Sequence, residues 1–250
     1  MGAQIVRGRL GMIKLRKEEL ADNVTLYCGD SREVIPKLKG IDAVVSDPPY
    51  GIEELIGGYG RTQLTKTGQS DRTIANDSNL KVVNEVFTLL RKQLKNAWVA
   101  AFYSCRITPD FFDTMKAYEY FGEVIWDKKA PGLGTQIRYQ HENIAFFKTG
   151  KPAQQLSDCM SVISYTALRG EQRTDGSTHP HEKPHQVMLN VLGAVPGKLV
   201  LDPFMGTGST GAAAVELKRG FVGIELNPKY FDVACKKVSA AINQPKSFWE

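Results

Sequence analysis

One stretch decides the fold class of this chain: Lys198-Leu199-Val200-Leu201-Asp202-Pro203-Phe204-Met205-Gly206-Thr207-Gly208-Ser209-Thr210-Gly211. Its apolar first half is typical of a buried strand, and a helical run over 212–217 follows the glycine-rich turn. Glycines let the backbone approach a ligand closely, and free amides at a helix start favour a carboxylate or phosphate. The stretch therefore predicts a strand, a tight turn and a helix that together bind an anionic group.

A further apolar strand, predicted over 221–225, ends in an acid. Nucleotide-binding sheets hold ribose hydroxyls at such a position, which makes Glu225 the predicted ribose ligand. The turn 206–211 also satisfies the dinucleotide pattern G-x-G-x-x-G, which would fit a nicotinamide or flavin enzyme. That alternative gives no function to a second motif of the chain, Asp47-Pro48-Pro49-Tyr50. The sequence also lacks the second nucleotide-binding half that such an enzyme would have.

The second motif is Asp47-Pro48-Pro49-Tyr50, which comes after the apolar run 41–45, typical of a buried strand. The paired prolines fix an extended turn, so Asp47 and the Pro48 carbonyl are held at the end of that strand. Two such acceptors can take both hydrogens of an exocyclic amine, while Tyr50 offers a flat face for a planar base. The alternative is an ordinary turn, in which Asp and Pro are common.

In this order, the two motifs resemble the beta-type (permuted) amino-group DNA methyltransferases, in which Asp-Pro-Pro-Tyr precedes the glycine-rich loop. The resemblance covers nearly the whole chain. It includes His179-Pro180-His181-Glu182-Lys183-Pro184, similar to the family's Pro-x-x-Lys-Pro segment, and Gly29-Asp30 after a predicted strand over 24–28. It implies transfer of a methyl group from S-adenosyl-L-methionine to adenine N6 in double-stranded DNA, with flipping of the base.

The resemblance also assigns residues. The catalytic set is Asp47, Pro48, Pro49 and Tyr50. The methionine end of the cofactor is expected at the turn 202–208, the ribose at Glu225 and the adenine edge at Asp30. The full expected cofactor-binding set is Asp30, Lys183, Asp202, Pro203, Phe204, Gly206, Thr207, Gly208, Ser209 and Glu225. His141 and Glu142 match a further family pattern and are expected to be structural or to face DNA.

Three alternatives to an adenine enzyme stay open. Cytosine-N4 enzymes more often carry Ser-Pro-Pro-Tyr, so Asp47 favours adenine without deciding it. An RNA or protein amide methyltransferase would typically begin the turn with Asn and place it after the glycine-rich loop. A catalytically silent DNA-binding subunit would carry a damaged motif, and both motifs are intact here.

Alternating strand and helix patterns predict an α/β fold with helices on both faces of the sheet. By resemblance, this is the Rossmann-like methyltransferase sheet, mostly parallel with an antiparallel hairpin at its edge. Besides the elements above, the expected strands are 43–46, 98–103, 122–127 and 143–148, and the expected helices are 32–38, 80–94 and 109–118. The last two strands, which no helix separates, form the expected hairpin.

At 250 residues the chain is long enough for one catalytic domain over 1–250. Family resemblance places a short target-recognition region at about 151–178 and a mobile loop that covers DNA at about 51–79. So short a region indicates a short recognition sequence, relaxed specificity or help from a second subunit. A homodimer is compatible with the family, and nothing in the sequence identifies a cognate restriction endonuclease.

Composition agrees with a DNA-binding enzyme without proving it. The net charge is +5, with 42% hydrophobic and 24% charged residues. No apolar run approaches the ~20 residues needed to cross a bilayer, so we expect no membrane association and a cytoplasmic, nucleoid-associated protein of bacterial or phage origin. Neither the four cysteines nor the cluster of His179, His181 and His185 has convincing metal-site spacing, and we expect no metal.

Overall fold

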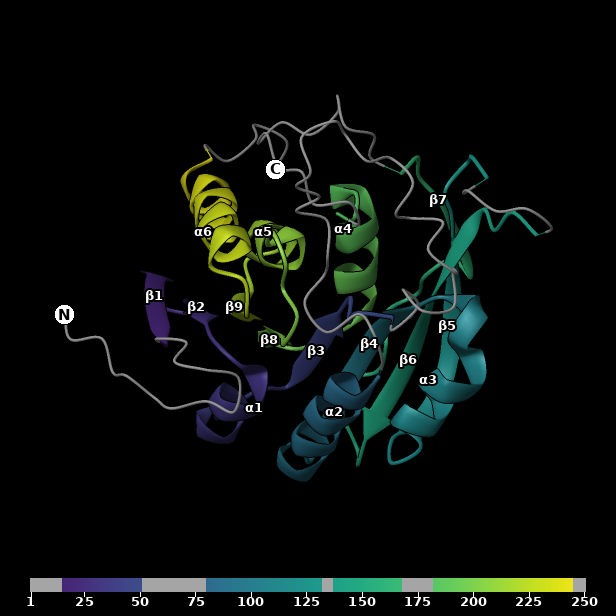
Figure 1. The fold of residues 1–250 in the computed structure, drawn as a ribbon, viewed down its shortest axis with the longest axis horizontal. Coiled ribbons are helices and arrows are strands. Elements are labelled where there is room, and N and C mark those ends of the chain that lie inside the picture. The colour runs from purple at the N-terminus through teal and green to yellow at the C-terminus, as the bar shows by residue number, and fades with distance from the viewer. Residues whose placement is uncertain (1–14, 51–79, 132–136, 168–181, 245–250) are drawn as a thin grey trace, which may run out of the picture.

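A computed structural model describes residues 15–50, 80–131, 137–167 and 182–244. Its centre is a nine-stranded sheet in the order β1-β2-β9-β8-β3-β4-β6-β5-β7 (Figure 1). The strands are β1 (Arg16–Ala21), β2 (Val24–Cys28), β3 (Ala43–Ser46), β4 (Ala97–Tyr103), β5 (Glu119–Asp127), β6 (His141–Thr149), β7 (Val162–Ser164), β8 (Leu199–Asp202) and β9 (Gly220–Glu225).

Five neighbouring strands, β2, β9, β8, β3 and β4, run parallel and form the middle of the sheet. Such strands are covered on both faces and therefore read as continuous apolar runs, as the fully buried Ala97–Tyr103 does. From β3 the chain continues to β4 on one side, and from β8 it continues to β9 on the other. The crevice between β3 and β8 is therefore a topological switch point, where open α/β sheets bind ligands.

The helices of the described residues lie on both faces of the sheet (Figure 1). One face carries α1 (Ser31–Val34), α2 (Lys81–Gln93) and α3 (Thr108–Met115), and the other carries α4 (His185–Ala194), α5 (Ser209–Glu216) and α6 (Pro228–Asn243). Single 3-10 turns, η1 (Ile35–Lys37) and η2 (Cys105–Ile107), follow α1 and precede α3. No helix in these described ranges is long and apolar enough to cross a membrane.

Each layer of helices has its own apolar core against the sheet. Phe87 and Leu90 of α2 and Phe111 of α3 belong to the core on one face. Val191 of α4 and Phe231 of α6 belong to the core on the opposite face. Burial of apolar area from both sides fixes the sheet, and with it the edge at which the parallel strands end.

The predicted fold class is confirmed: the sheet is mostly parallel, with helices on both faces and an antiparallel pair formed by β5 and β6. The strands expected at 24–28 and 43–46 have those bounds. The hairpin is not itself the edge, because β7 adds three residues parallel to β5. β7 has only one buried residue, too few to give a readable alternation.

Two further elements were absent from the sequence analysis. β1 reads RKEELA, and its charges suit an edge strand that protects its free hydrogen-bonding groups. α6 begins after Asn227, whose side chain accepts from the Lys229 amide, with Pro228 in its first turn. This cap was a readable signal. The expected loop 51–79, residues 168–178 of the recognition region and the histidines His179 and His181 lie outside the described residues.

Candidate active site

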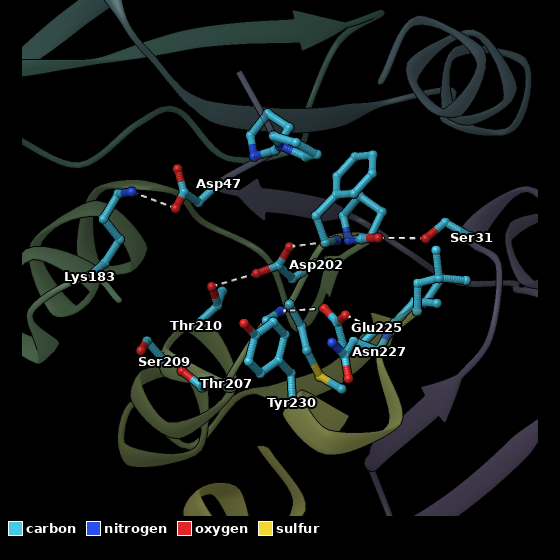
Figure 2. Close-up of a pocket in the computed structure, with 18 of the residues that line it drawn as sticks. Ser31, Asp47, Lys183, Asp202, Thr207, Ser209, Thr210, Glu225, Asn227 and Tyr230 are labelled. Carbon is cyan, nitrogen blue, oxygen red and sulfur yellow. Dashed lines mark hydrogen bonds and ion pairs between the residues drawn. The ribbon is translucent and has the colours of Figure 1, made fainter. Parts of the chain in front are cut away.

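A pocket opens at the carboxyl ends of β3, β8 and β9, over the switch point of the sheet. Its space, counted with its open mouth and the solvent in it, is about 1210 Å³. Thirteen of the fourteen predicted site residues line it, and Gly208 is the exception. Figure 2 shows Asp47 and Lys183 on one side and Glu225 and Asn227 on the other, with Asp202 between them.

Asp47 follows β3 directly, and both of its carboxylate oxygens accept a bond from a side chain. The Tyr50 hydroxyl donates to Oδ1 at 2.8 Å, and the Lys183 ammonium pairs with Oδ2 (Figure 2). Lys183 is only 5% exposed and lies over the rings of Tyr50 and Phe102. The structure therefore places Lys183 against Asp47, the predicted amine acceptor, whereas its predicted role is in cofactor binding.

Glu142, on β6, completes this charged group. Its Oε2 accepts from the Tyr50 hydroxyl at 3.1 Å and lies 3.2 Å from the Lys183 ammonium, while its Oε1 accepts from Lys128 at 2.7 Å. Burial disfavours the carboxylate, but the two ammonium groups outweigh it and hold the pKa of Glu142 well below its usual range. We call Asp47, Tyr50, Lys128, Glu142 and Lys183 the amine end of the site.

The other half of the pocket, which we call the cofactor end, comprises Asp202, Glu225 and the turn 203–208. Asp202 is 1% exposed and accepts from the hydroxyls of Ser46 at 2.8 Å and Thr210 at 2.6 Å and from the Phe204 amide at 3.1 Å. Burial raises the pKa of Asp202 to about 6 against the effect of these bonds. With its oxygens so engaged, Asp202 shapes the turn from within.

Glu225 ends β9 and accepts two backbone amides. Gly206 donates to Oε2 at 3.0 Å and Asn227 donates to Oε1 at 2.7 Å. Burial raises the pKa of Glu225 to about 7 despite these bonds. Each oxygen keeps a lone pair for an outside donor, because an ionised carboxylate has about four acceptor sites.

The glycine-rich turn requires backbone conformations that other residues rarely adopt. Gly208 precedes α5 with φ +85°, and a Cβ there would lie 3.0 Å from Ala234 of α6. Gly206, the donor to Glu225, has φ +53°. On the far side of the turn, the Pro203 carbonyl accepts from the Ser31 hydroxyl at 2.5 Å. The turn is therefore held from both helical layers.

Asp30, the predicted contact of the adenine edge, caps α1. Its carboxylate accepts from the Arg32 amide at 2.9 Å and pairs with the Arg32 guanidinium at 2.6 Å. Although burial opposes it, these contacts hold the pKa of Asp30 below its ordinary value. Arg32 is also paired with Glu85 of α2 at 2.5 Å. Asp30 lines the pocket, so its remaining acceptor capacity faces the same space as Glu225.

The structure adds residues that the sequence analysis did not assign to the site. Pocket-lining additions are Ser31, Val82, Glu182, Met188, Met205, Thr210, Ile224, Leu226, Asn227 and Tyr230. His185, the described member of the histidine cluster, forms a hydrogen bond with Glu216 at 2.6 Å. The larger omission is Glu142 with Lys128: the strand order β3-β4-β6 brings Glu142 toward Asp47, and the pairing of β5 with β6 brings Lys128 to Glu142.

Comparison with known proteins gives a consistent result. The family model described as DNA methylase, for N6 and N4 enzymes, matches residues 41–236. The type II methyltransferase M.HinfI of Haemophilus influenzae is 26% identical over 254 residues, covering 90% of this chain and 71% of that protein.

Two solved structures share the fold. The M1.HpyAVI-SAM complex matches with a TM-score of 0.57 and 23% identity, covering 85% of this chain and 98% of the other. PvuII DNA methyltransferase, which is cytosine-N4-specific, matches with a TM-score of 0.64 and 14% identity, covering 91% and 88%. The shared fold therefore extends over most of each chain.

Proposed function

The chain belongs to the DNA methylase family of N6 and N4 enzymes, and from this premise we propose that it transfers a methyl group from S-adenosyl-L-methionine to the N6 amine of adenine in DNA. One observation carries the proposal: Asp47 and the glycine-rich turn, 155 residues apart by the difference between Asp47 and Asp202, line one pocket. This shared pocket supports a reaction in which the amine acceptor and the cofactor site act together.

The amine end suits the activation of an exocyclic amine. Its nitrogen lone pair is delocalised into the ring, so hydrogen bonds to both N-H groups are needed to favour a tetrahedral, nucleophilic nitrogen. Asp47 and the Pro48 carbonyl supply those acceptors. The nitrogen then forms a bond to the methyl carbon as the bond from that carbon to sulfur breaks, and Asp47 takes up the proton that the nitrogen gives up. Placement and electrostatics, without a covalent enzyme intermediate, provide the catalysis.

The cofactor end suits S-adenosyl-L-methionine, which supplies the activated methyl group. Glu225 and Asp30 offer carboxylate acceptors to hydroxyl and amino hydrogens, while Ile224 and Leu226 add apolar lining. The fold is shared with M1.HpyAVI, which was solved with this cofactor.

A target base inside a duplex has to leave the stack, at an unstacking cost of a few kcal/mol. Stacking on the Tyr50 ring offsets part of that cost. The Tyr50 hydroxyl is fixed by Asp47 and Glu142, which sets the orientation of its ring. Lys128 donates to Glu142 and so adds a positive charge beside Tyr50 and Asp47, on the side where the phosphate backbone of the DNA would pass.

We also propose that the enzyme is of the beta-type, permuted group, with one catalytic domain over 1–250 and a short recognition region at about 151–178; the order of the two motifs in the sequence supports this. We place it in the cytoplasm of a bacterium or in a phage-infected cell. The family alone suggests a homodimer, and a partner endonuclease is not identified.

Cytosine N4 is the second candidate target. The specific observation in its favour is the similarity in fold to the cytosine-N4-specific PvuII enzyme. Asp47 favours adenine as a family tendency, since cytosine enzymes more often have Ser at this position. The same acceptor pair would activate either amine.

Transfer of a tritiated methyl group tests the proposal against the RNA, protein and silent-subunit alternatives. Unmethylated DNA, RNA and protein are incubated side by side with the wild-type chain and with Asp47→Ala. We expect label in DNA alone, and none with the variant. Label in RNA or protein, no label in any substrate, or transfer that survives Asp47→Ala contradicts the proposal.

A further inference from the structure

We propose that Glu142 is a positioning residue that takes over the two donors bound to Asp47 when the target amine arrives. The inference rests on the proposed function and adds a residue to it. The Tyr50 hydroxyl and the Lys183 ammonium, which occupy one Asp47 oxygen each, both lie within 3.2 Å of Glu142 Oε2 as well. Both donors are therefore shared between the two carboxylates.

An amine cannot use Asp47 fully while these donors stay in place. Each Asp47 oxygen already accepts one bond, and the Lys183 ammonium brings a positive charge to the place where the amine nitrogen becomes positive during transfer. Lys183 is almost fully buried, so removing it from Asp47 without another partner would strand a buried charge. A second acceptor is needed nearby.

Glu142 meets this requirement and is itself fixed. Its other oxygen is held by Lys128 at 2.7 Å, and it lies on β6, where Glu142 pairs with Trp126 in the register of the hairpin. Glu142 is not among the described residues that line the pocket. It therefore acts on the amine through Lys183 and Tyr50 (Figure 2 shows the contact of Lys183 with Asp47).

The arrangement leaves every buried group satisfied during the exchange. Lys183 and the Tyr50 hydroxyl move onto Glu142 by changing side-chain torsions, and Asp47 turns both oxygens toward the amine. Two carboxylates and two ammonium groups remain together throughout, so the net charge of the cluster does not change. Replacing Glu142 by a neutral amide would hold Lys183 on Asp47.

The test compares Glu142→Gln with Glu142→Asp, which keeps the charge, and with Glu123→Gln as a matched control. Glu123 also accepts a tyrosine hydroxyl, from Tyr103 at 2.7 Å, but lies outside the pocket lining. Single-turnover transfer from tritiated S-adenosylmethionine to unmethylated DNA is measured beside the dissociation constant of the cofactor. Circular dichroism and thermal unfolding check that each variant folds.

We expect Glu142→Gln to slow single-turnover transfer by about 10- to 100-fold, the loss equivalent to one charged hydrogen bond, with cofactor affinity within about twofold of wild type. Glu142→Asp should recover part of the rate, and Glu123→Gln should match wild type. Lys183→Met combined with Glu142→Gln should be less harmful than the product of the single effects, because both act through one contact.

Three results would overturn the inference while leaving the proposed function intact: wild-type rates with Glu142→Gln, equal losses of rate and cofactor affinity, or multiplicative effects in the double variant. If Glu142→Gln does not fold, Glu142→Asp decides: a wild-type rate and affinity with this shortened carboxylate would likewise overturn the inference. A wild-type chain that shows no Asp47-dependent transfer to DNA overturns both proposals.

Discussion

The amine end and the cofactor end of one pocket hold their carboxylates in different ways. At the amine end, Asp47 and Glu142 accept from a tyrosine hydroxyl and two ammonium groups, all on side chains that can change partner. At the cofactor end, Asp202 and Glu225 accept mainly from backbone amides and short hydroxyl side chains, which are fixed by the turn.

The two ends therefore depend on different properties: the amine end depends on charge, and the cofactor end depends on the shape of the turn. Ammonium partners lower the pKa of Glu142, whereas burial without a cation raises the pKa of Asp202 to about 6 and of Glu225 to about 7. A change of charge should therefore affect the amine end most through the rate of transfer. A change that removes a hydrogen-bond acceptor at the cofactor end should mainly lower cofactor affinity and the free energy of unfolding.

The largest expected effect comes from Asp47→Asn. An amide keeps the shape of the side chain but loses the charge and one acceptor, so transfer to DNA should fall by about 10³-fold or more. The dissociation constant of the cofactor, measured by calorimetry, should stay within about threefold. Asp113→Asn, a change at an exposed carboxylate on α3, is the matched control. Equal losses in rate and cofactor binding would remove the distinction between the two ends.

Asp202→Ala should break the cofactor end in the complementary way. It leaves the hydroxyls of Ser46 and Thr210 and the Phe204 amide without their acceptor. The free energy of unfolding in urea should fall by about 3 kcal/mol, and the cofactor should bind about 100-fold more weakly. Asp202→Asn should be milder, because its amide keeps one oxygen acceptor. Unchanged cofactor affinity in Asp202→Ala would contradict the proposed role of the turn.

The two ends should respond to pH with opposite sign. Because the pKa values of Asp202 and Glu225 are raised, their contribution to stability is fully present below the usual carboxyl pKa and is lost as pH rises toward about 6 and 7. The lowered pKa of Glu142 gives a contribution that is present above its usual pKa and is lost as pH falls.

Urea unfolding between about pH 3 and pH 8 measures both contributions. Glu225→Gln should flatten the loss on the alkaline side, by about 1–3 kcal/mol, and Glu142→Gln should flatten the loss on the acidic side. If both variants changed the free energy of unfolding on the same side of the pH profile, the two ends would not be electrostatically distinct.

The smallest expected effect is on the pH dependence of cofactor binding. An ionised Glu225 accepts a hydroxyl hydrogen more strongly than a neutral one, so affinity should rise by up to about tenfold as pH increases through about 7. Glu225→Gln should bind more weakly and show no such rise. An affinity that falls over this range in the wild-type chain would rule out Glu225 as the ribose acceptor.

The sequence was most informative where local pattern and burial agree. The parallel strand β3 could be read as a buried apolar run, and the prolines after Asp47 and the glycines before α5 marked the two turns that line the pocket. The family resemblance supplied the expectation that these turns meet. Their meeting depends on β3 and β8 being neighbours, which is a property of the strand order.

The rest of the site depends on pairing that no local pattern encodes. Glu142 is 92 residues from Tyr50, and the strand order β3-β4-β6 with the register of β4 and β6 puts its side chain near Asp47. Lys183 was found in the sequence but was assigned to the cofactor, because its spacing to Pro184 says nothing of its ion pair with Asp47. The edge strand β1 carries charges that hide its strand pattern.

Nucleoside mass spectrometry of methylated DNA tests the central claim most directly. Unmethylated DNA is incubated with S-adenosylmethionine and the wild-type chain, digested to nucleosides and analysed beside a reaction with Asp47→Ala. The account predicts N6-methyladenine with the wild type and none with the variant. N4-methylcytosine would show that the site is right and the target base wrong, whereas no modified nucleoside, or N6-methyladenine that persists with Asp47→Ala, would contradict the account.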